Sequence, residues 1–255
     1  MLAASSMLDA ITNFLAVGTQ LLLAKSLGLT TAEQLYFAAA TTAATTIYTA
    51  KLLPVDTLRA IVLPWLRLIY GVRSIYPERL PEKGGVLIVA NHVSYIDAFI
   101  MSAGCHRTVR FLMMKKYYDM RWANWFLRSA GAIPIDTETG QASAAIKACV
   151  DSLKNNEVVC IFPEGELTRD GELKEFKRGM EIIAEKANTP VVPVAMSGLF
   201  GSYFSHWGKG LMKGLPRRLP LKVRVQFAEP IAPQDVTAKD TQRIINDMLA
   251  DLHEK

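Results

Sequence analysis

The 255-residue sequence contains few residues that cross-link a chain or hold a metal ion, with three Cys and four His. The cysteines, Cys105, Cys149 and Cys160, are odd in number and lie in separate apolar stretches, so they do not predict a disulfide framework. The sequence has no Cys-x-x-Cys pair, and isolated His residues do not predict a zinc site. We therefore expect no metal, no cofactor and a reducing compartment.

Other absences argue against whole classes of function. The sequence has no Gly-x-Ser-x-Gly elbow, which disfavours a serine lipid hydrolase. Residues 1–10 carry no Lys or Arg, unlike the start of a secretory signal peptide. The net charge of +5 could suit nucleic acid, but the basic residues lack an interleaved aromatic platform. Attraction to anionic lipid is the better account, so we expect a membrane-lipid partner and no nucleic acid.

Hydrophobic residues make up 50% of the sequence, and their excess lies near its start. An apolar helix is predicted over about residues 7–27, close to the roughly 20 residues that a bilayer span requires. The capping box Thr30-x-x-Glu33 predicts a second helix over about residues 32–53, whose small residues suit helix packing in lipid. A helical hairpin outside the membrane and an anchor lying in the interface remain alternatives. They rest on three polar side chains of the first helix, which are costly in hydrocarbon: Asp9, Asn13 and Gln20.

Positive charge accumulates after the second helix, at Lys51, Arg59, Arg67 and Arg73. The loop between the two helices has only Lys25 nearby. This bias predicts that the main domain lies on the cytoplasmic face of a bacterial inner membrane, integrally or tightly associated. The segment from Arg59 to Tyr70 combines Arg, Trp and aliphatic residues at helical spacing. That pattern is typical both of an interfacial helix and of a helix packed on a domain.

From residue 75 onward, short apolar runs alternate with helical patterns. The alternation predicts an α/β domain with a largely parallel central sheet flanked by helices, preceded by the N-terminal membrane-associated helical hairpin. The expected strands are 85–90, 109–113, 132–135, 158–162, 191–195 and 221–227. The expected helices are 118–129, 141–155, 177–187 and 233–253. We divide the chain into a membrane helix pair over 1–54, an amphipathic connecting helix over 55–74 and a main domain over 75–255.

The segment from Asn91 to Asp97 directly follows the apolar run 85–90. A strand that ends in a His, followed by a turn and a helix start, allows Asp97 to return beside His92. A His with an orienting carboxylate can act as a general base, so the pair predicts an acyl-transfer or hydrolytic site. Ser94 in the turn is a candidate helix N-cap. Glu164 follows the expected strand 158–162, where open α/β sheets place ligands.

Four sequence blocks, in order, resemble those of the glycerolipid acyltransferases, which include the bacterial 1-acylglycerol-3-phosphate acyltransferases. The blocks are Asn-His-x4-Asp at 91–97, Gly-Ala-Ile-Pro-Ile-Asp at 131–136, Phe-Pro-Glu-Gly at 162–165 and Val-Val-Pro-Val at 191–194. The resemblance covers about residues 75–230. It implies transfer of a fatty acyl group from acyl-CoA or acyl carrier protein to a lysolipid hydroxyl, with His92 as base and Asp97 orienting it. The residues that we assign to substrate binding are Asn91, Ser94, Glu164, Gly165, Arg169, Lys174 and Pro193.

Residues 2–54 also resemble the closing helix pair of a major-facilitator transporter, of the kind that bacteria fuse to an acyltransferase domain. This resemblance implies an upstream transporter module as a partner. A non-catalytic lipid-binding module, or the remnant of such a fusion, is therefore the alternative to an active enzyme. The complete His92 and Asp97 pair favours the enzyme.

The chain departs from the family pattern at two positions. Members that use a phosphate monoester usually carry Arg after the Ile-Asp of the second block and in Glu-Gly-Thr-Arg, where this chain has Thr137 and Leu167. Arg forks suit a phosphate monoester, so the acceptor stays open between 1-acylglycerol-3-phosphate and 2-acylglycerophosphoethanolamine, in phospholipid biosynthesis or repair. Four downstream residues could replace the lost charge or form a solvated basic face: Arg169, Lys174, Lys177 and Arg178.

Overall fold

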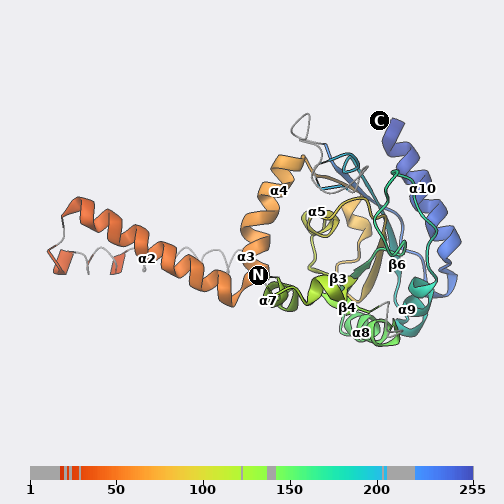
Figure 1. Ribbon diagram of the computed structural model, residues 1–255, viewed down its shortest axis with the longest axis horizontal. Helices are drawn as coiled ribbons and strands as arrows, with labels where there is room; N and C mark the ends of the chain where they lie inside the picture. Colours follow the sequence, from red (N-terminus) through yellow and green to blue (C-terminus); the bar gives the residue numbers. More distant parts are fainter. Residues whose placement is uncertain are drawn as a thin grey trace. The chain divides into compact units, whose positions relative to one another are not determined.

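The computed structural model of the protein describes residues 18–19, 22, 25–28, 30–121, 123–136, 142–202, 204–205 and 222–254 (Figure 1). It separates into two compact units, Met1–Pro54 and Val55–Lys255. The predicted connecting segment 55–74 belongs to the second unit, and the three-part division stays a prediction. Most of the predicted first helix, and Thr137, lie outside the described residues.

The first unit contains helix α2, Thr31–Leu52. The predicted capping box opens it, because the Thr30 hydroxyl accepts a hydrogen bond from the Glu33 amide and the Glu33 carboxylate accepts one from the Thr30 amide. Among the described residues, no helix is both long enough and apolar enough to cross a membrane. The expectation that α2 is a membrane span is therefore not supported.

The second unit is built on a seven-stranded sheet in the order β1-β7-β6-β2-β5-β3-β4. The strands are β1 Arg73–Ile75, β2 Val86–Ala90, β3 Val109–Met114, β4 Ile133–Ile135, β5 Val158–Ile161, β6 Val191–Ser197 and β7 Arg224–Phe227. Every pair is parallel except β6 with β7. The predicted α/β domain with a largely parallel sheet is thus confirmed.

Helices connect the strands and cover the sheet (Figure 1). The α-helices are α3 Pro54–Thr57, α4 Leu63–Tyr70, α5 Asp97–Gly104, α6 Lys115–Tyr118, α7 Asn124–Ser129, α8 Ala142–Lys154, α9 Gly179–Ala187 and α10 Ala238–Glu254. A π-helical turn, η1, spans Leu58–Val62, and the 3₁₀ turns η2 and η3 span Pro77–Arg79 and Pro233–Asp235.

Strand β2 lies in the middle of the sheet and is buried on both faces. Leu87 and Val89 belong to a core cluster with α8, α9 and α10, whereas Val86 and Ile88 belong to a second cluster with α4 and α5. Alternate side chains of a strand point to opposite faces, so this one apolar run supplies both cores. The strand that carries Asn91 and His92 at its end is therefore fixed from both sides.

The structure corrects several predicted boundaries. Instead of one helix over 118–129, α6 ends at Tyr118 and α7 begins at Asn124, whose side chain donates a hydrogen bond to the Tyr118 carbonyl. The predicted helix from Arg59 to Tyr70 is interrupted by η1. Pro64 has no amide hydrogen, so the regular bond to the Ala60 carbonyl cannot form, and the wider turn lies directly before it. Strand β1 was not predicted, because three residues give too short a pattern.

All three cysteines are buried. Burial raises the pKa of Cys105 and of Cys149 to about 12, and it raises the pKa of Cys160 well above the usual range. Since the thiolate is the reactive form, we expect almost no alkylation of the native protein between pH 7 and pH 9. Iodoacetamide labelling followed by mass spectrometry should show three reactive thiols only after unfolding in denaturant. Rapid labelling of any one thiol in the native chain would contradict its placement.

Candidate active site

The carboxyl ends of three strands meet at one edge of the sheet. In register, Val89 of β2 lies beside Ile161 of β5, and Ala90 lies beside Val194 of β6. The Asn91 amide joins β2 to β6, because its Nδ2 donates to the Met196 carbonyl at 2.9 Å and its Oδ1 accepts from the Met196 amide at 2.7 Å. The residue after Asn91 is therefore held at a fixed position on this edge.

His92 and Asp97 lie together as predicted. The His92 Nδ1 atom lies 2.8 Å from Asp97 Oδ2, which also accepts hydrogen bonds from the backbone amides of Val93 at 2.7 Å and Ser94 at 2.8 Å. Asp97 is fully buried as the first residue of α5. Burial raises the pKa of this carboxyl, while the hydrogen bond and charge of His92 and the two backbone amides act in the opposite direction. The turn formed by residues 92–97 is sufficient to place this carboxylate beside the imidazole.

The His92 imidazole is held by a stacking contact on its face in addition to the Asp97 contact at Nδ1. The ring of Phe162, the residue after β5, stacks on it with centroids 4.2 Å apart and an interplanar angle of 12°. Within the described part of the chain, no hydrogen-bond partner occupies Nε2, and 24% of the His92 side chain is exposed. The second ring nitrogen is thus open to a substrate at the sheet edge.

The backbone of His92 is held by the segment that follows β5. The Glu164 carboxylate accepts from the His92 amide at 2.7 Å through Oε1 and from the Lys174 amide at 3.0 Å through Oε2. The Thr168 amide donates to the His92 carbonyl at 3.0 Å. Burial raises the pKa of Glu164, and the amides of Lys174 and His92 oppose this effect. Both polar backbone groups of His92 therefore depend on residues more than 70 positions later.

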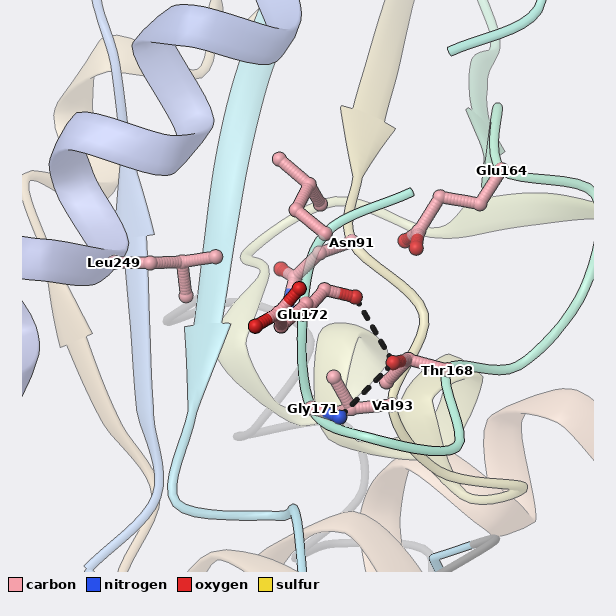
Figure 2. A pocket seen from close by; sticks show the side chains of 8 residues that line it. Asn91, Val93, Glu164, Thr168, Gly171, Glu172 and Leu249 are labelled. Carbon is pink, nitrogen blue, oxygen red and sulfur yellow. Dashed lines mark hydrogen bonds between the residues drawn. The ribbon is translucent and has the colours of Figure 1, made fainter. Parts of the chain in front are cut away.

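Thr168 was not among the predicted site residues. It is buried, and its hydroxyl, which has one hydrogen to donate, lies within hydrogen-bond distance of Asp170 Oδ1 and of the Glu172 carbonyl. The same oxygen accepts from the Gly171 amide, and Figure 2 shows the contacts with Glu172 and Gly171. These bonds close the loop that carries Glu164. A hydroxyl followed by Asp and Gly is a turn signal, so its local role could have been found in the sequence, but its contact with His92 could not.

A small cavity lies beside these residues, lined among others by Asn91, Glu164, Thr168 and Leu249 of α10 (Figure 2). It has room for about one water molecule. A fatty acyl chain does not fit in this cavity, whereas the His92 side chain is 24% exposed.

The remaining predicted site residues lie as follows. Gly165 is in the left-handed region at φ +76°, Arg169 is exposed on the loop, and the Lys174 ammonium pairs with Glu166 at 2.7 Å. Pro193 is buried inside β6 beside Val89, a placement that does not support contact with substrate.

Two further predictions need correction. Ser94 is fully buried, and α5 begins after Ile96 with no side-chain cap, so Ser94 is not its N-cap. The side chains of Asn91 and Glu164 are committed to backbone partners, which supports a positioning role for both and does not support the predicted direct contact with substrate. Among the described residues, no group of three or more His, Cys, Asp or Glu could hold a metal ion.

Glu164→Gln should destabilise the protein. An amide offers only one oxygen, so its NH₂ group would face either the His92 or the Lys174 amide, and one buried hydrogen bond would be lost. We expect the free energy of unfolding to fall by about 1–3 kcal/mol. Urea denaturation of the two proteins measures this difference, with the exposed Glu185→Gln as the matched control. Equal stability of Glu164→Gln and the unaltered protein would contradict the double backbone contact.

Comparison with known proteins agrees with the sequence motifs. Residues 71–197 match the family described as Acyltransferase. The 1-acyl-sn-glycerol-3-phosphate acyltransferase of Bacillus subtilis is 33% identical over 129 residues, covering 50% of this chain and 63% of that protein. The probable 1-acyl-sn-glycerol-3-phosphate acyltransferase of Mycoplasma pneumoniae is 29% identical over 189 residues, covering 71% of this chain and 70% of that protein.

The fold also matches a solved structure. The crystal structure of the 1-acyl-sn-glycerophosphate (LPA) acyltransferase PlsC from Thermotoga maritima superposes with a TM-score of 0.61 at 21% identity, covering 86% of this chain and 93% of that one. Neither the family nor this structure concerns the predicted transporter resemblance, which stays a prediction. His92, Asp97 and Glu164 all lie inside the matched region. Through residues 71–197, about half of its length, the chain belongs to the acyltransferase family.

Proposed function

We propose that this protein is a lysophospholipid acyltransferase. The observation that carries the proposal is the 2.8 Å contact of His92 Nδ1 with a buried Asp97 carboxylate, with Nε2 open at the carboxyl edge of the sheet. The acyl donor is acyl-CoA or acyl carrier protein, and the product belongs to phospholipid biosynthesis or repair. The family membership and the names of the relatives support this assignment.

The contact with Asp97 supports Nε2 of His92 as the base. Asp97 Oδ2 is an acceptor, so His92 Nδ1 carries the hydrogen and Nε2 keeps its lone pair. Nε2 takes the proton of the acceptor hydroxyl while that oxygen attacks the thioester carbonyl, forming a C–O bond. The C–S bond then breaks, and the imidazolium returns the proton to the departing thiolate. Asp97 stabilises the imidazolium between these two events.

The acceptor is a lysolipid with a free glycerol hydroxyl. The relatives are named 1-acyl-sn-glycerol-3-phosphate acyltransferases, which supports 1-acylglycerol-3-phosphate for this chain. The half-buried Leu167, at a position where an Arg would suit a phosphate monoester, supports 2-acylglycerophosphoethanolamine instead. Both acceptors carry a phosphate close to the hydroxyl that reacts.

Helix α4 supports association with a membrane surface, and the Lys and Arg bias of the sequence supports the cytoplasmic side. Leu63 and Tyr70 are buried and belong to the side of the helix that contacts α5, while Trp65, Leu68 and Ile69 are 60%, 68% and 43% exposed. The two predicted roles of this segment are therefore compatible, because one face packs on the domain and another presents aromatic and aliphatic groups. An upstream transporter module remains a further proposal, supported only by the sequence resemblance.

His92→Ala should lower the rate of transfer by about 100- to 10,000-fold, the range that general base catalysis supplies. The assay offers labelled acyl-CoA and acyl carrier protein against lysophosphatidic acid and lysophosphatidylethanolamine. His106→Ala is the matched control, because His106 is exposed. Substantial transfer by His92→Ala would remove this residue from the mechanism. Absence of transfer by the unaltered protein to either acceptor would favour the non-catalytic alternative.

Asp97→Asn should reduce transfer by at least about 100-fold while the fold is kept. The Val93 and Ser94 amides both donate to the Oδ2 position, so the oxygen of the Asn side chain is expected to take that place. His92 Nδ1 would still donate to it, and the main loss would be the negative charge that stabilises the imidazolium. Rate measurements with circular dichroism as the folding control test this. A near-normal rate would mean that the Asp97 charge is dispensable.

A further inference from the structure

The acceptor proposed above needs a cation near the reacting hydroxyl. In a lysophospholipid the phosphate is only a few bonds from that hydroxyl, so a group that binds it must lie at the same sheet edge as His92. Four basic residues follow Glu164 in the sequence, and the structure separates them. Lys174 pairs with Glu166 at 2.7 Å, and Arg178 pairs with Glu181 at 2.8 Å. Their charges are already balanced by carboxylates.

Lys177 and Arg169 differ from both of these, since neither has a carboxylate partner within 4.0 Å among the described residues. Lys177 alone of the four contributes the atoms nearest to a Cβ position at Gly165, and it is exposed. Its backbone amide donates to the Pro163 carbonyl at 3.0 Å, which fixes the start of its side chain beside the turn after β5. Lys177 also helps to lower the pKa of Glu166, after the larger effects of Lys174 and then of Arg169.

The side chain of Lys177 lies directly on Gly165. A Cβ atom added to Gly165 would be 2.4 Å from the Lys177 Nζ atom and 3.1 Å from its Cε atom. Gly165 therefore has two reasons to be glycine, its φ of +76° and the ammonium that occupies the space of a side chain. This packing confines a cation that lacks an ion-pair partner among the described residues.

The turn that confines the ammonium is the one that holds the base. Phe162 stacks on the His92 ring, and Glu164, the residue before Gly165, accepts from the His92 amide. Lys177 is bonded to the carbonyl between them, that of Pro163. The backbone of Lys177 is thus bonded to the same short turn that contacts the base through the residues on either side of Pro163.

We propose that Lys177 binds the phosphate of the acceptor lysolipid, supplying the positive charge that Leu167 does not. The inference rests on the proposed function and names the group that binds the acceptor phosphate. An ammonium binds phosphate as a point charge without the fixed fork geometry of a guanidinium, and both monoesters and diesters carry free anionic oxygens. Lys177 therefore suits both a phosphate monoester and the phosphodiester of a headgroup-bearing lysolipid.

Steady-state kinetics of the full chain test the proposal. With the acyl donor fixed, Lys177→Met should raise KM for lysophosphatidic acid by about 10- to 100-fold, the effect of losing a hydrogen bond to a charged group. We expect kcat and the KM of the donor to change by less than about twofold, since the phosphate takes no part in the reaction and its binding is equal in the ground and transition states. Monoacylglycerol, which lacks the phosphate, should show no rise in KM.

Three variants separate a phosphate contact from other effects. Lys177→Arg should keep a low KM for lysophosphatidic acid. Lys186→Met removes the same charge from an exposed position of α9 and should leave KM unchanged. Arg169→Gln removes a charge from the same loop. The proposal is overturned if Lys177→Met leaves KM unchanged, if KM rises equally for monoacylglycerol, or if Lys186→Met or Arg169→Gln produces the loss and Lys177→Met does not.

A binding measurement keeps this test independent of turnover. Calorimetric titration of lysophosphatidic acid into the His92→Ala protein, with and without Lys177→Met, reports the phosphate contact when no reaction occurs. Weaker binding of about 10-fold or more in the double variant supports the proposal, and equal binding overturns it. Absence of transfer by the unaltered protein would instead overturn the proposed function, so the two failures are distinguishable.

Discussion

A single buried oxygen, Oδ2 of Asp97, accepts hydrogen bonds from two backbone amides and lies 2.8 Å from the His92 imidazole. Burying a carboxylate is costly unless hydrogen-bond donors reach it, and here the turn between β2 and α5 brings donors to Oδ2, while Oδ1 has no partner among the described residues. The same contacts that make the buried charge tolerable also choose the nitrogen of His92 that carries hydrogen. The chemistry proposed for the site and the stability of the turn therefore rest on one atom.

The rest of the site is made by contacts between distant parts of the sequence. Asn91 reaches Met196 across 105 residues, and Glu164 reaches the His92 amide across 72. Each of these side chains bonds to backbone atoms, whose positions are set by strand pairing. Because β2 lies between β5 and β6, the order of the strands alone brings the three segments to one edge. Phe162 contacts the face of the His92 ring, Asp97 contacts its Nδ1 atom, and Glu164 and Thr168 bond to its backbone. The orientation of the base is therefore fixed before a substrate binds.

The sequence predicted what depends on local pattern. The apolar runs located six of the seven strands, and the five-residue spacing of His92 and Asp97 predicted their contact, because both lie in one turn. The backbone partners of Glu164 and Asn91 were not predicted, since a motif shows that a residue matters without showing whether it touches substrate or backbone. Thr168 and the stacking of Phe162 on His92 depend on the register of β2 against β5, which no local pattern encodes. Lys177 could be distinguished from its neighbours only once the partners of Lys174 and Arg178 were known.

The two long-range bonds to the His92 backbone have a consequence for synthesis of the chain. A growing polypeptide that has emerged only as far as residue 150 already contains the complete His92 and Asp97 turn, yet it lacks Glu164, Thr168 and Met196. Its imidazole has a carboxylate beside it but no fixed position, because strands β5 and β6 must pair with β2 before the backbone is held. His92 and Asp97 lie early in the sequence, but they reach their final positions late, after β5 and β6 have paired with β2.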